Sequence, residues 1–174
     1  IVNSYSHFEK RGIIMENLYD LTNPQKSIWL TEQYYKGSNI NNICGALTIK
    51  KPLDFEKFKQ AINLFIKNND SFRICLKMYK NEVKQYIKAF STFDIDIIDL
   101  KDEKSVKDFE HYFASLPLFD FDKVLFKFIL FRLPNGHGGF IINTHHIISD
   151  SWSLGITVNE IINYYSALLK EQTY

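Results

Sequence analysis

The stretch FIINTHHIISDSWS, residues 140–153, runs from an apolar segment through two adjacent histidines into the start of an amphipathic segment. Residues 140–144 are apolar and rich in β-branched side chains, which favours an extended strand. Beyond residue 153, apolar side chains recur at helical spacing, at Leu154, Val158, Ile161, Ile162, Tyr165, Leu168 and Leu169. The stretch therefore predicts a strand that leads directly into a helix, with the histidines at the junction.

The junction carries His145 and His146, whose imidazoles can take up or release a proton near neutral pH. Adjacent residues on a strand point to opposite faces of a sheet, so only one of the pair can face a given cavity. We therefore expect the two histidines to have divided roles. Asp150 and Ser151 lie where the helix begins, and their side-chain oxygens can cap its free N–H groups.

Helical patterns also occur upstream of the histidines, each next to a capping signal. Residues 22–25, TNPQ, have the form of a capping box for a helix over about residues 23–35, with proline placed early, where its missing N–H costs little. Asp54 caps a second helix, whose apolar stripe consists of Phe55, Phe58, Ala61, Ile62, Phe65 and Ile66. Residues 105–108, SVKD, cap a third helix, which Pro117 should end.

Extended patterns lie between these helices and after them. Strands are predicted at residues 43–49, 72–78, 83–89, 93–97, 124–133 and 140–144. The second and third of these form a hairpin, and the Gly-rich residues 134–139 form a turn between the last two. Lys127 and Arg132 are the only charges of strand 124–133, so we expect this strand to be covered on both faces. The interleaved order predicts an α/β (α+β) fold in which helices pack against a mixed sheet.

The composition is that of a globular chain with one core. Its 174 residues are 45% hydrophobic and 16% aromatic, which suffices for a buried core in a single domain. The formal net charge of +1 gives no overall electrostatic reason to bind nucleic acid or an anionic membrane. No apolar run reaches the roughly 20 residues of a membrane helix. Cys44 and Cys75 lie in apolar stretches without special spacing, so we expect buried thiols and a reducing, cytoplasmic setting.

The two ends of the chain carry less structural signal than its middle. Residues 1–17 mix polar and apolar side chains without a clear period, and we interpret them as a partly mobile leader. Residues 18–174 then form a single domain. The chain starts with Ile1 and ends just past the last expected helix, so we expect it to be a segment of a longer protein.

Taken alone, the histidine pair has simpler interpretations. One is a pair of strand-end histidines that bond to backbone carbonyls. A metal site is a second alternative, but adjacent strand histidines do not easily face one ion, and the sequence has no further clear ligand cluster. The sequence also lacks a nucleophile elbow and a Gly-rich phosphate loop, so covalent serine catalysis and nucleotide binding have no support.

Residues 145–151, HHIISDS, closely resemble the HHxxxDG motif of condensation domains in nonribosomal peptide synthetases. Trp152 and Ser153 extend the match. Together with the paired histidines, they favour a condensation domain over the related epimerization and heterocyclization domains. Ser151 stands where the family usually has Gly, so a positive φ or a very close substrate approach would be hindered there.

Two further segments resemble condensation-domain motifs, and they occur in the expected order. Residues 21–30, LTNPQKSIWL, resemble the first motif, and we interpret their side chains mainly as helix-capping and core-packing groups. Residues 68–73, NNDSFR, are a degraded match to the second motif that keeps its final Arg73. In the family this Arg pairs with the Asp of the histidine motif, so the resemblance implies a salt bridge between Arg73 and Asp150. A planar guanidinium can hold a carboxylate through two parallel hydrogen bonds and so fix the loop that presents the histidines.

The resemblance implies a chloramphenicol-acetyltransferase-like half-domain, the N-terminal subdomain of a condensation domain whose active site lies in a tunnel between two such halves. The implied reaction is amide-bond formation between aminoacyl or peptidyl thioesters on donor and acceptor carrier proteins. These partners bring the phosphopantetheine, and the domain itself is expected to hold neither cofactor nor metal. The implied catalytic residue is His146, and the implied supporting residues are His145, Asp150, Ser151, Arg73 and Trp152. The missing C-terminal half and an adenylation domain of the same native chain are further implied partners, whereas nucleic acid and membrane are not.

Two alternatives to this reaction remain open. A related acyltransferase would move an acyl group from coenzyme A or a carrier protein onto an alcohol or amine, and such enzymes resemble the HHxxxD pattern too. Alternatively, the half-domain acts only as a folding or docking unit, because it lacks the second wall of the tunnel. We expect the full-length protein to be an enzyme and the isolated chain of 174 residues to be inactive.

Overall fold

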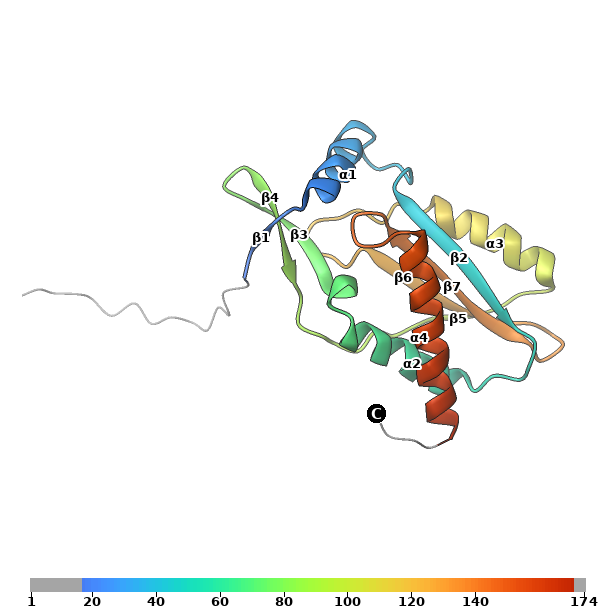
Figure 1. The fold of residues 1–174 in the computed structure, drawn as a ribbon. Helices are drawn as coiled ribbons and strands as arrows, with labels where there is room; N and C mark the ends of the chain where they lie inside the picture. Colours follow the sequence, from blue (N-terminus) through green and yellow to red (C-terminus); the bar gives the residue numbers. More distant parts are fainter. Residues whose placement is uncertain (1–16, 171–174) are drawn as a thin grey trace, which may run out of the picture.

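The structure, a computed structural model, describes residues 17–170, and within them the strands form a four-stranded and a three-stranded sheet (Figure 1). The strands of the larger sheet, in spatial order, are β2 (Asn42–Ile49), β7 (Gly138–His145), β6 (Phe126–Arg132) and β5 (Ile97–Asp99). β5 runs parallel to β6 and the other neighbours are antiparallel, so the predicted mixed sheet is confirmed. The leader predicted at residues 1–17 lies outside the described residues, apart from Asn17.

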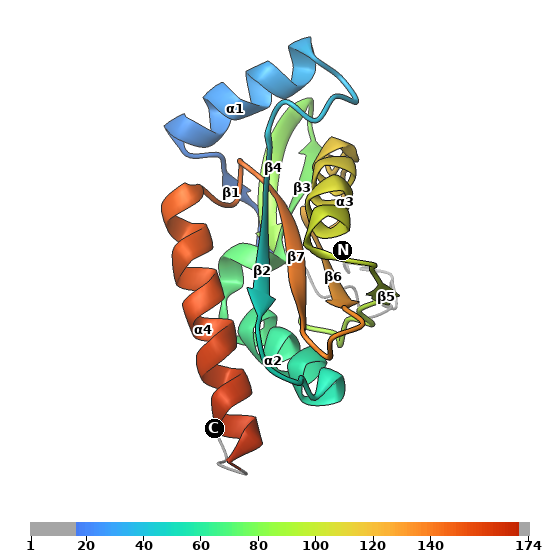
Figure 2. The same ribbon diagram turned by 90° about the vertical axis from the view of Figure 1, so that its right-hand side faces the viewer.

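Helices cover both faces of the larger sheet (Figure 2). They are α2 (Phe55–Asn68) and α4 (Ser151–Leu169) on one face and α3 (Glu103–Ser115) on the other. In β6, Leu130 packs with side chains of α2 and α4, whereas Ile129 and Phe131 pack on the α3 side. The two charged residues of this strand, Lys127 and Arg132, are exposed near its ends. The prediction that this strand is covered on both faces is confirmed.

The smaller sheet lies beside helix α1 (Asn23–Tyr34). Its strands, all antiparallel, are β1 (Tyr19–Asp20), β4 (Glu82–Ile87) and β3 (Ile74–Tyr79). Helix α1 opens with the predicted capping box between Thr22 and Gln25. The cluster that joins these elements to the turn after β7 consists of Leu21, Leu76, Leu125 and Ile147, with Ile28 and Trp29 packed against it. Helix α1 therefore lies across the end of the larger sheet at which β7 finishes (Figure 2).

The predicted strands 72–78 and 93–97 begin later than expected, and contacts of their first residues explain why. Phe72 and Arg73 lie in the 3₁₀ turn η1 (Asp70–Arg73) rather than in β3, and Phe72 is buried in the main core. Residues 93–96 lie outside β5, and the backbone N–H and carbonyl of Phe93 bond instead to the Asn63 side chain of α2 at 2.7 and 3.0 Å. A local turn thus takes the place of sheet pairing at Phe72 and Arg73, and a side-chain amide does so at Phe93.

One cap and one turn also differ from the prediction. Helix α3 is capped by Asp102, and Ser105 is the third helical residue of its capping box rather than the cap. Gly139 belongs to β7 rather than to the preceding turn, and a Cβ there would overlap the Leu47 carbonyl on the neighbouring strand. Glycine therefore permits a close approach of two backbones at this position. Gly136, with a φ of +79°, is the glycine that shapes the turn itself.

Candidate active site

The histidine pair lies where β7 ends, and its two side chains occupy different environments. His145 is the last residue of β7, pairs with Asn42 of β2 and is 1% exposed. His146 belongs to the following turn and is exposed. The change from strand to turn leaves one imidazole in the interior and the other at the surface, as expected for a pair with divided roles.

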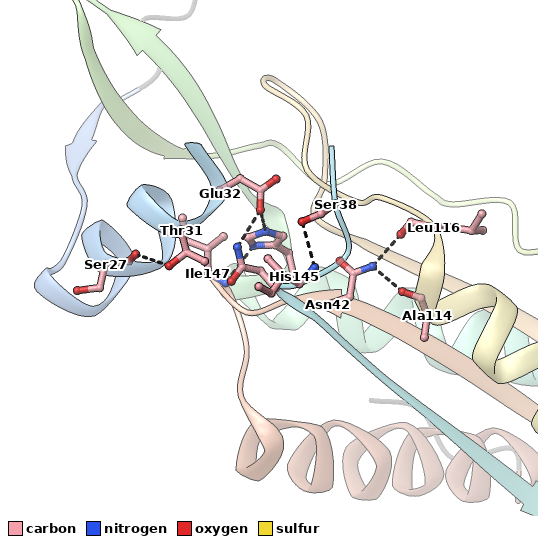
Figure 3. Close-up of polar contacts among 11 residues, drawn as sticks. Ser27, Thr31, Glu32, Ser38, Asn42, Ala114, Leu116, His145 and Ile147 are labelled. Atoms are coloured by element: carbon pink, nitrogen blue, oxygen red, sulfur yellow. Dashed lines mark hydrogen bonds and ion pairs between the residues drawn. The ribbon is translucent and has the colours of Figure 1, made fainter. Parts of the chain in front are cut away.

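Two hydrogen bonds hold the imidazole of His145 in one orientation (Figure 3). Its Nδ1 accepts the backbone N–H of Ile147 at 3.1 Å, so this nitrogen carries no proton. Its Nε2 therefore carries the proton and donates it to Glu32 Oε2 of α1 at 3.1 Å. Burial lowers the pKa of His145, although the hydrogen bond to Glu32 acts in the opposite direction. The ring is therefore neutral as well as fixed.

Glu32 and Asn41 were not predicted as site residues, yet both are buried beside His145. Glu32 is 3% exposed and Asn41 is 7% exposed, and Asn41 Nδ2 donates to Glu32 Oε2 at 2.8 Å. The sequence carries a signal for Glu32, which shares one helix face with Gln25 and Trp29. A carboxylate on an inward face requires a buried donor. Asn41 lies in a loop without periodicity, and its local sequence gives no such signal.

The imidazole of His146 is fixed through the opposite ring nitrogen. Its Nδ1 bonds to the Ser149 carbonyl at 2.9 Å, and because a carbonyl can only accept, Nδ1 carries the proton. The lone pair therefore lies on Nε2 of an exposed ring. The backbone N–H of His146 donates to the Asn41 carbonyl at 2.7 Å, which ties the turn to the loop before β2. The adjacent histidines thus have opposite tautomers, and His146 is arranged to accept a proton.

The carboxylate of Asp150 acts locally, at the start of helix α4. Its Oδ1 accepts from the N–H and the hydroxyl of Ser153 at 2.7 and 2.6 Å, and these bonds lower the pKa of Asp150. The predicted cap is therefore confirmed. Ser151 is the first residue of α4. Its φ angle is not positive, so its Cβ does not strain the backbone. Trp152 is 80% exposed.

The predicted salt bridge between Arg73 and Asp150 is wrong. Arg73 pairs with Asp70, three residues earlier in η1, and also donates to the Lys88 carbonyl at 3.1 Å. Because η1 forms, a carboxylate lies within one turn of the guanidinium, while the Asp150 carboxylate bonds to Ser153. Arg73 therefore secures the end of the β3–β4 hairpin rather than the loop that carries the histidines.

The segment that resembles the first condensation-domain motif lies against the histidine turn. Gln25 completes the capping box of α1, and its Nε2 also donates to the Ile147 carbonyl at 3.2 Å. The ring of Trp29 lies 5.5 Å from Phe119 and 5.6 Å from Phe121, between ring centroids. The predicted capping and packing roles are confirmed. Gln25 adds a contact to the turn that the sequence pattern did not predict.

The two cysteines are thiols, and the described residues contain no cluster of metal ligands. Cys44 and Cys75 do not form a disulfide, and Cys75 is buried as predicted. Cys44 is half-buried, and burial raises its pKa to about 12, so its thiol stays protonated near neutral pH. Across residues 17–170, no three His, Cys, Asp or Glu side chains gather as a metal site would, and no helix is both long and apolar enough to cross a membrane.

Comparison with known sequences assigns the family. The profile of the family described as "Condensation domain" matches residues 15–174. The chain is 36% identical over 159 residues to surfactin synthase subunit 1 of Bacillus subtilis (strain 168), covering 86% of this chain and 4% of that protein. It is 28% identical over 155 residues to bacitracin synthase 2 of Bacillus licheniformis, covering 88% of this chain and 6% of that protein. The chain belongs to the condensation-domain family of nonribosomal peptide synthetases.

Comparison with solved structures agrees with this assignment. A variant of the starter condensation domain of rhizomide synthetase RzmA, solved in complex with C8-CoA, matches with a TM-score of 0.82 at 21% sequence identity. The match covers 90% of this chain and 37% of that chain. The predicted chloramphenicol-acetyltransferase-like fold is confirmed, and the chain corresponds to the N-terminal part of a condensation domain.

Proposed function

We propose that the chain is one half of a catalytic domain that joins an acceptor amine to a donor acyl group, with both substrates held as thioesters on carrier proteins. The observation that carries this proposal is the arrangement of His146. Its exposed imidazole donates through Nδ1 to the Ser149 carbonyl and keeps its lone pair on Nε2. Such a ring can accept a proton from a substrate amine.

In the proposed reaction, the acceptor's amine nitrogen attacks the carbonyl carbon of the donor thioester. The C–N bond forms as the amine gives its proton to His146 Nε2, and the C–S bond then breaks as that proton passes to the departing thiolate. An α-amine has a reference pKa of roughly 7.7–8.0, so an appreciable fraction is already neutral near pH 7.5. General base catalysis of this kind is typically worth about 10²–10⁴-fold, and holding both thioesters in line lowers the barrier further.

The other motif residues would support His146 rather than touch the reacting atoms. His145 anchors the end of β7 through Glu32, and Asp150 fixes the start of α4. Ser151 adds a side chain where the family usually has Gly, without straining the backbone. Arg73 does not belong to this group, because it bonds within the hairpin.

We propose several partners, because the chain covers only a small share of its relatives, such as 4% of surfactin synthase subunit 1. They are donor and acceptor carrier proteins that bring phosphopantetheine, the C-terminal half of the condensation domain, and an adenylation domain in the same native chain. Trp152 and Ile156 lie one turn apart on α4 and are 80% and 48% exposed, so they offer an apolar surface to the second half. We propose a cytoplasmic protein whose condensation domain holds no cofactor of its own.

A second candidate function is acyl transfer from an acyl-coenzyme A donor. The similar starter condensation domain of rhizomide synthetase is described in complex with C8-CoA, which motivates this candidate. Coenzyme A also presents an acyl thioester, so the same proton acceptor would serve. The two candidates therefore differ in the donor and share the role of His146.

The experiment uses the complete condensation domain that contains this chain. Loaded donor and acceptor carrier proteins are incubated with the domain, in parallel with acyl-coenzyme A as the donor, and products are quantified by mass spectrometry. We expect His146→Ala to lower the rate of dipeptidyl-thioester formation by about 10²–10⁴-fold without loss of folding. His111→Ala, at an exposed histidine of α3, should leave the rate unchanged. A near wild-type rate for His146→Ala would remove His146 from the mechanism, and product from acyl-coenzyme A alone would favour the second candidate.

A further inference from the structure

We propose that Glu32 of α1 is a positioning residue for His146 and acts on it through His145 and Asn41. This inference rests on the proposed function of His146 as the proton acceptor. It extends that function to a helix that precedes the histidines by more than a hundred residues, since Glu32 and His145 are 113 positions apart.

One oxygen of Glu32 accepts two hydrogen bonds from separate parts of the chain (Figure 3). Asn41 Nδ2 donates to Oε2 at 2.8 Å from the loop before β2. His145 Nε2 donates to the same oxygen at 3.1 Å from the end of β7. The carboxylate on α1 therefore fixes the loop and the strand end relative to each other.

The same two residues hold the backbone on both sides of the His146 side chain. The N–H of His146 donates to the Asn41 carbonyl at 2.7 Å, and the N–H of Ile147 donates to His145 Nδ1 at 3.1 Å. Both peptide groups that flank the His146 Cα are thus tied to residues that Glu32 holds. A displaced Glu32 would therefore change the direction in which His146 Nε2 points.

The burial of this network supports a role beyond stability. Glu32, Asn41 and His145 are 3%, 7% and 1% exposed, and the Phe119 ring lies 5.5 Å from the His145 ring. Well-packed apolar side chains at such a site are often as stabilising as a buried charged network, or more so. The polar network supplies directional hydrogen bonds to a turn, which apolar side chains cannot provide. These bonds end at the residue to which we assign proton transfer.

The test is a double-variant cycle in the complete condensation domain, read out as the rate of dipeptidyl-thioester formation from loaded carrier proteins. We expect Glu32→Ala to lower kcat about 10–100-fold, with KM for the acceptor carrier protein within about threefold, because misplacing a catalytic group lowers the rate of the chemical step. Glu32→Gln should recover most of this loss, since an amide oxygen can still accept from both donors. In the His146→Ala background, Glu32→Ala should cause no further loss. Gln33→Ala, at the adjacent position of α1, is the matched control and should leave the rate unchanged.

The outcomes separate this proposal from the proposed function. An equal loss from Glu32→Ala in both backgrounds would indicate a general folding effect, overturning the positioning role while leaving His146 in the mechanism. Full activity of His146→Ala would instead overturn the proposed function, and the positioning role with it. If Glu32→Ala does not fold, Asn41→Ala replaces it in the same double-variant cycle. This variant removes one donor to Glu32 and keeps the backbone carbonyl that accepts from the N–H of His146. Its expected loss of about tenfold in kcat should likewise vanish in the His146→Ala background.

Discussion

His145 and His146 are neighbours in the sequence, but their surroundings are opposite in kind. His145 is 1% exposed, and both of its ring nitrogens are hydrogen-bonded to other parts of the protein. His146 is exposed, and its Nδ1 bonds to the Ser149 carbonyl, so its lone pair lies on Nε2. A strand end followed by a turn is therefore enough to place one imidazole of a histidine pair in the interior and the other at the surface.

The two rings also differ in which nitrogen carries the proton. The ring of His145 uses its lone pair on the Ile147 N–H, so it has none to offer a substrate. The ring of His146 uses its N–H on a carbonyl and keeps its lone pair. This difference is the reason that we propose His145 as the supporting residue and His146 as the residue that accepts the proton.

The largest expected effect comes from substituting the buried histidine, His145. His145→Ala removes a donor to the buried Glu32 carboxylate and the acceptor of the Ile147 N–H, which should lower the free energy of unfolding by about 3 kcal/mol. Urea unfolding measures this loss. His146→Ala removes an exposed ring and should change the same free energy by less than about 1 kcal/mol. Equal losses for the two variants would contradict the comparison.

The next effect is a pH dependence of stability that the buried histidine produces. Burial lowers the pKa of His145 from its ordinary value of 6.5, against the opposing influence of Glu32 and with a small contribution from His146. As the pH falls below about 6.5, the unfolded chain binds a proton at this residue that the folded protein does not bind. The free energy of unfolding should therefore fall by up to about 1.4 kcal/mol per pH unit until the folded-state pKa is reached.

Urea unfolding at about pH 7.0 and about pH 5.5 measures this slope. His145→Asn should remove this part of the decline, because asparagine does not titrate. His111→Asn, at an exposed histidine, should keep it. If His145→Asn retained the wild-type slope, the acid sensitivity would have to be assigned to other groups.

A smaller effect is expected at the helix start that follows the pair. Asp150→Ala removes the side-chain cap of α4, and the loss of an N-cap should lower the melting temperature by roughly 2–4 °C. The rate of condensation should fall as well, because the cap lies next to the histidine turn. Asp150→Asn keeps a capping oxygen and should retain most of the melting temperature. An unchanged melting temperature for Asp150→Ala would argue against the cap.

The smallest expected effect is the coupling between Arg73 and Asp150. A double variant of these two residues is the control for Asp150→Ala. The two residues form no ion pair in the part of the chain that the structure describes, so their shifts in melting temperature should add in the double variant. A double variant less destabilised than this sum would reinstate the salt bridge that the family resemblance implies.

Most of the fold could be predicted because the sequence carries clear periods and caps. The apolar stripe of α2 behind Asp54 and the capping box at residues 22–25 are both confirmed. Two of the errors occur where a contact distant in sequence replaces a local signal. Asn63 takes the backbone groups of Phe93 out of the predicted strand, and the Leu47 carbonyl explains why the strand position of Gly139 requires glycine.

The site could be predicted only where its residues are contiguous. Alternation and capping rules place His145, His146 and Asp150 at a strand end, a turn and a helix start. Glu32 reaches His145 across 113 positions, and no local pattern specifies such a contact. The predicted partner of Arg73 was wrong for the opposite reason, because a carboxylate three residues away in η1 binds the guanidinium that the prediction had assigned to the distant Asp150.

The role of His146 is tested most directly by a long-range ¹H–¹⁵N correlation spectrum of the histidine side chains, recorded near pH 7.5 on the ¹⁵N-labelled complete domain. The hydrogen-bond pattern predicts opposite neutral tautomers, with the proton on Nε2 of His145 and on Nδ1 of His146. A proton on Nε2 of His146, or the same tautomer in both rings, would contradict the assignment of His146 as the proton acceptor.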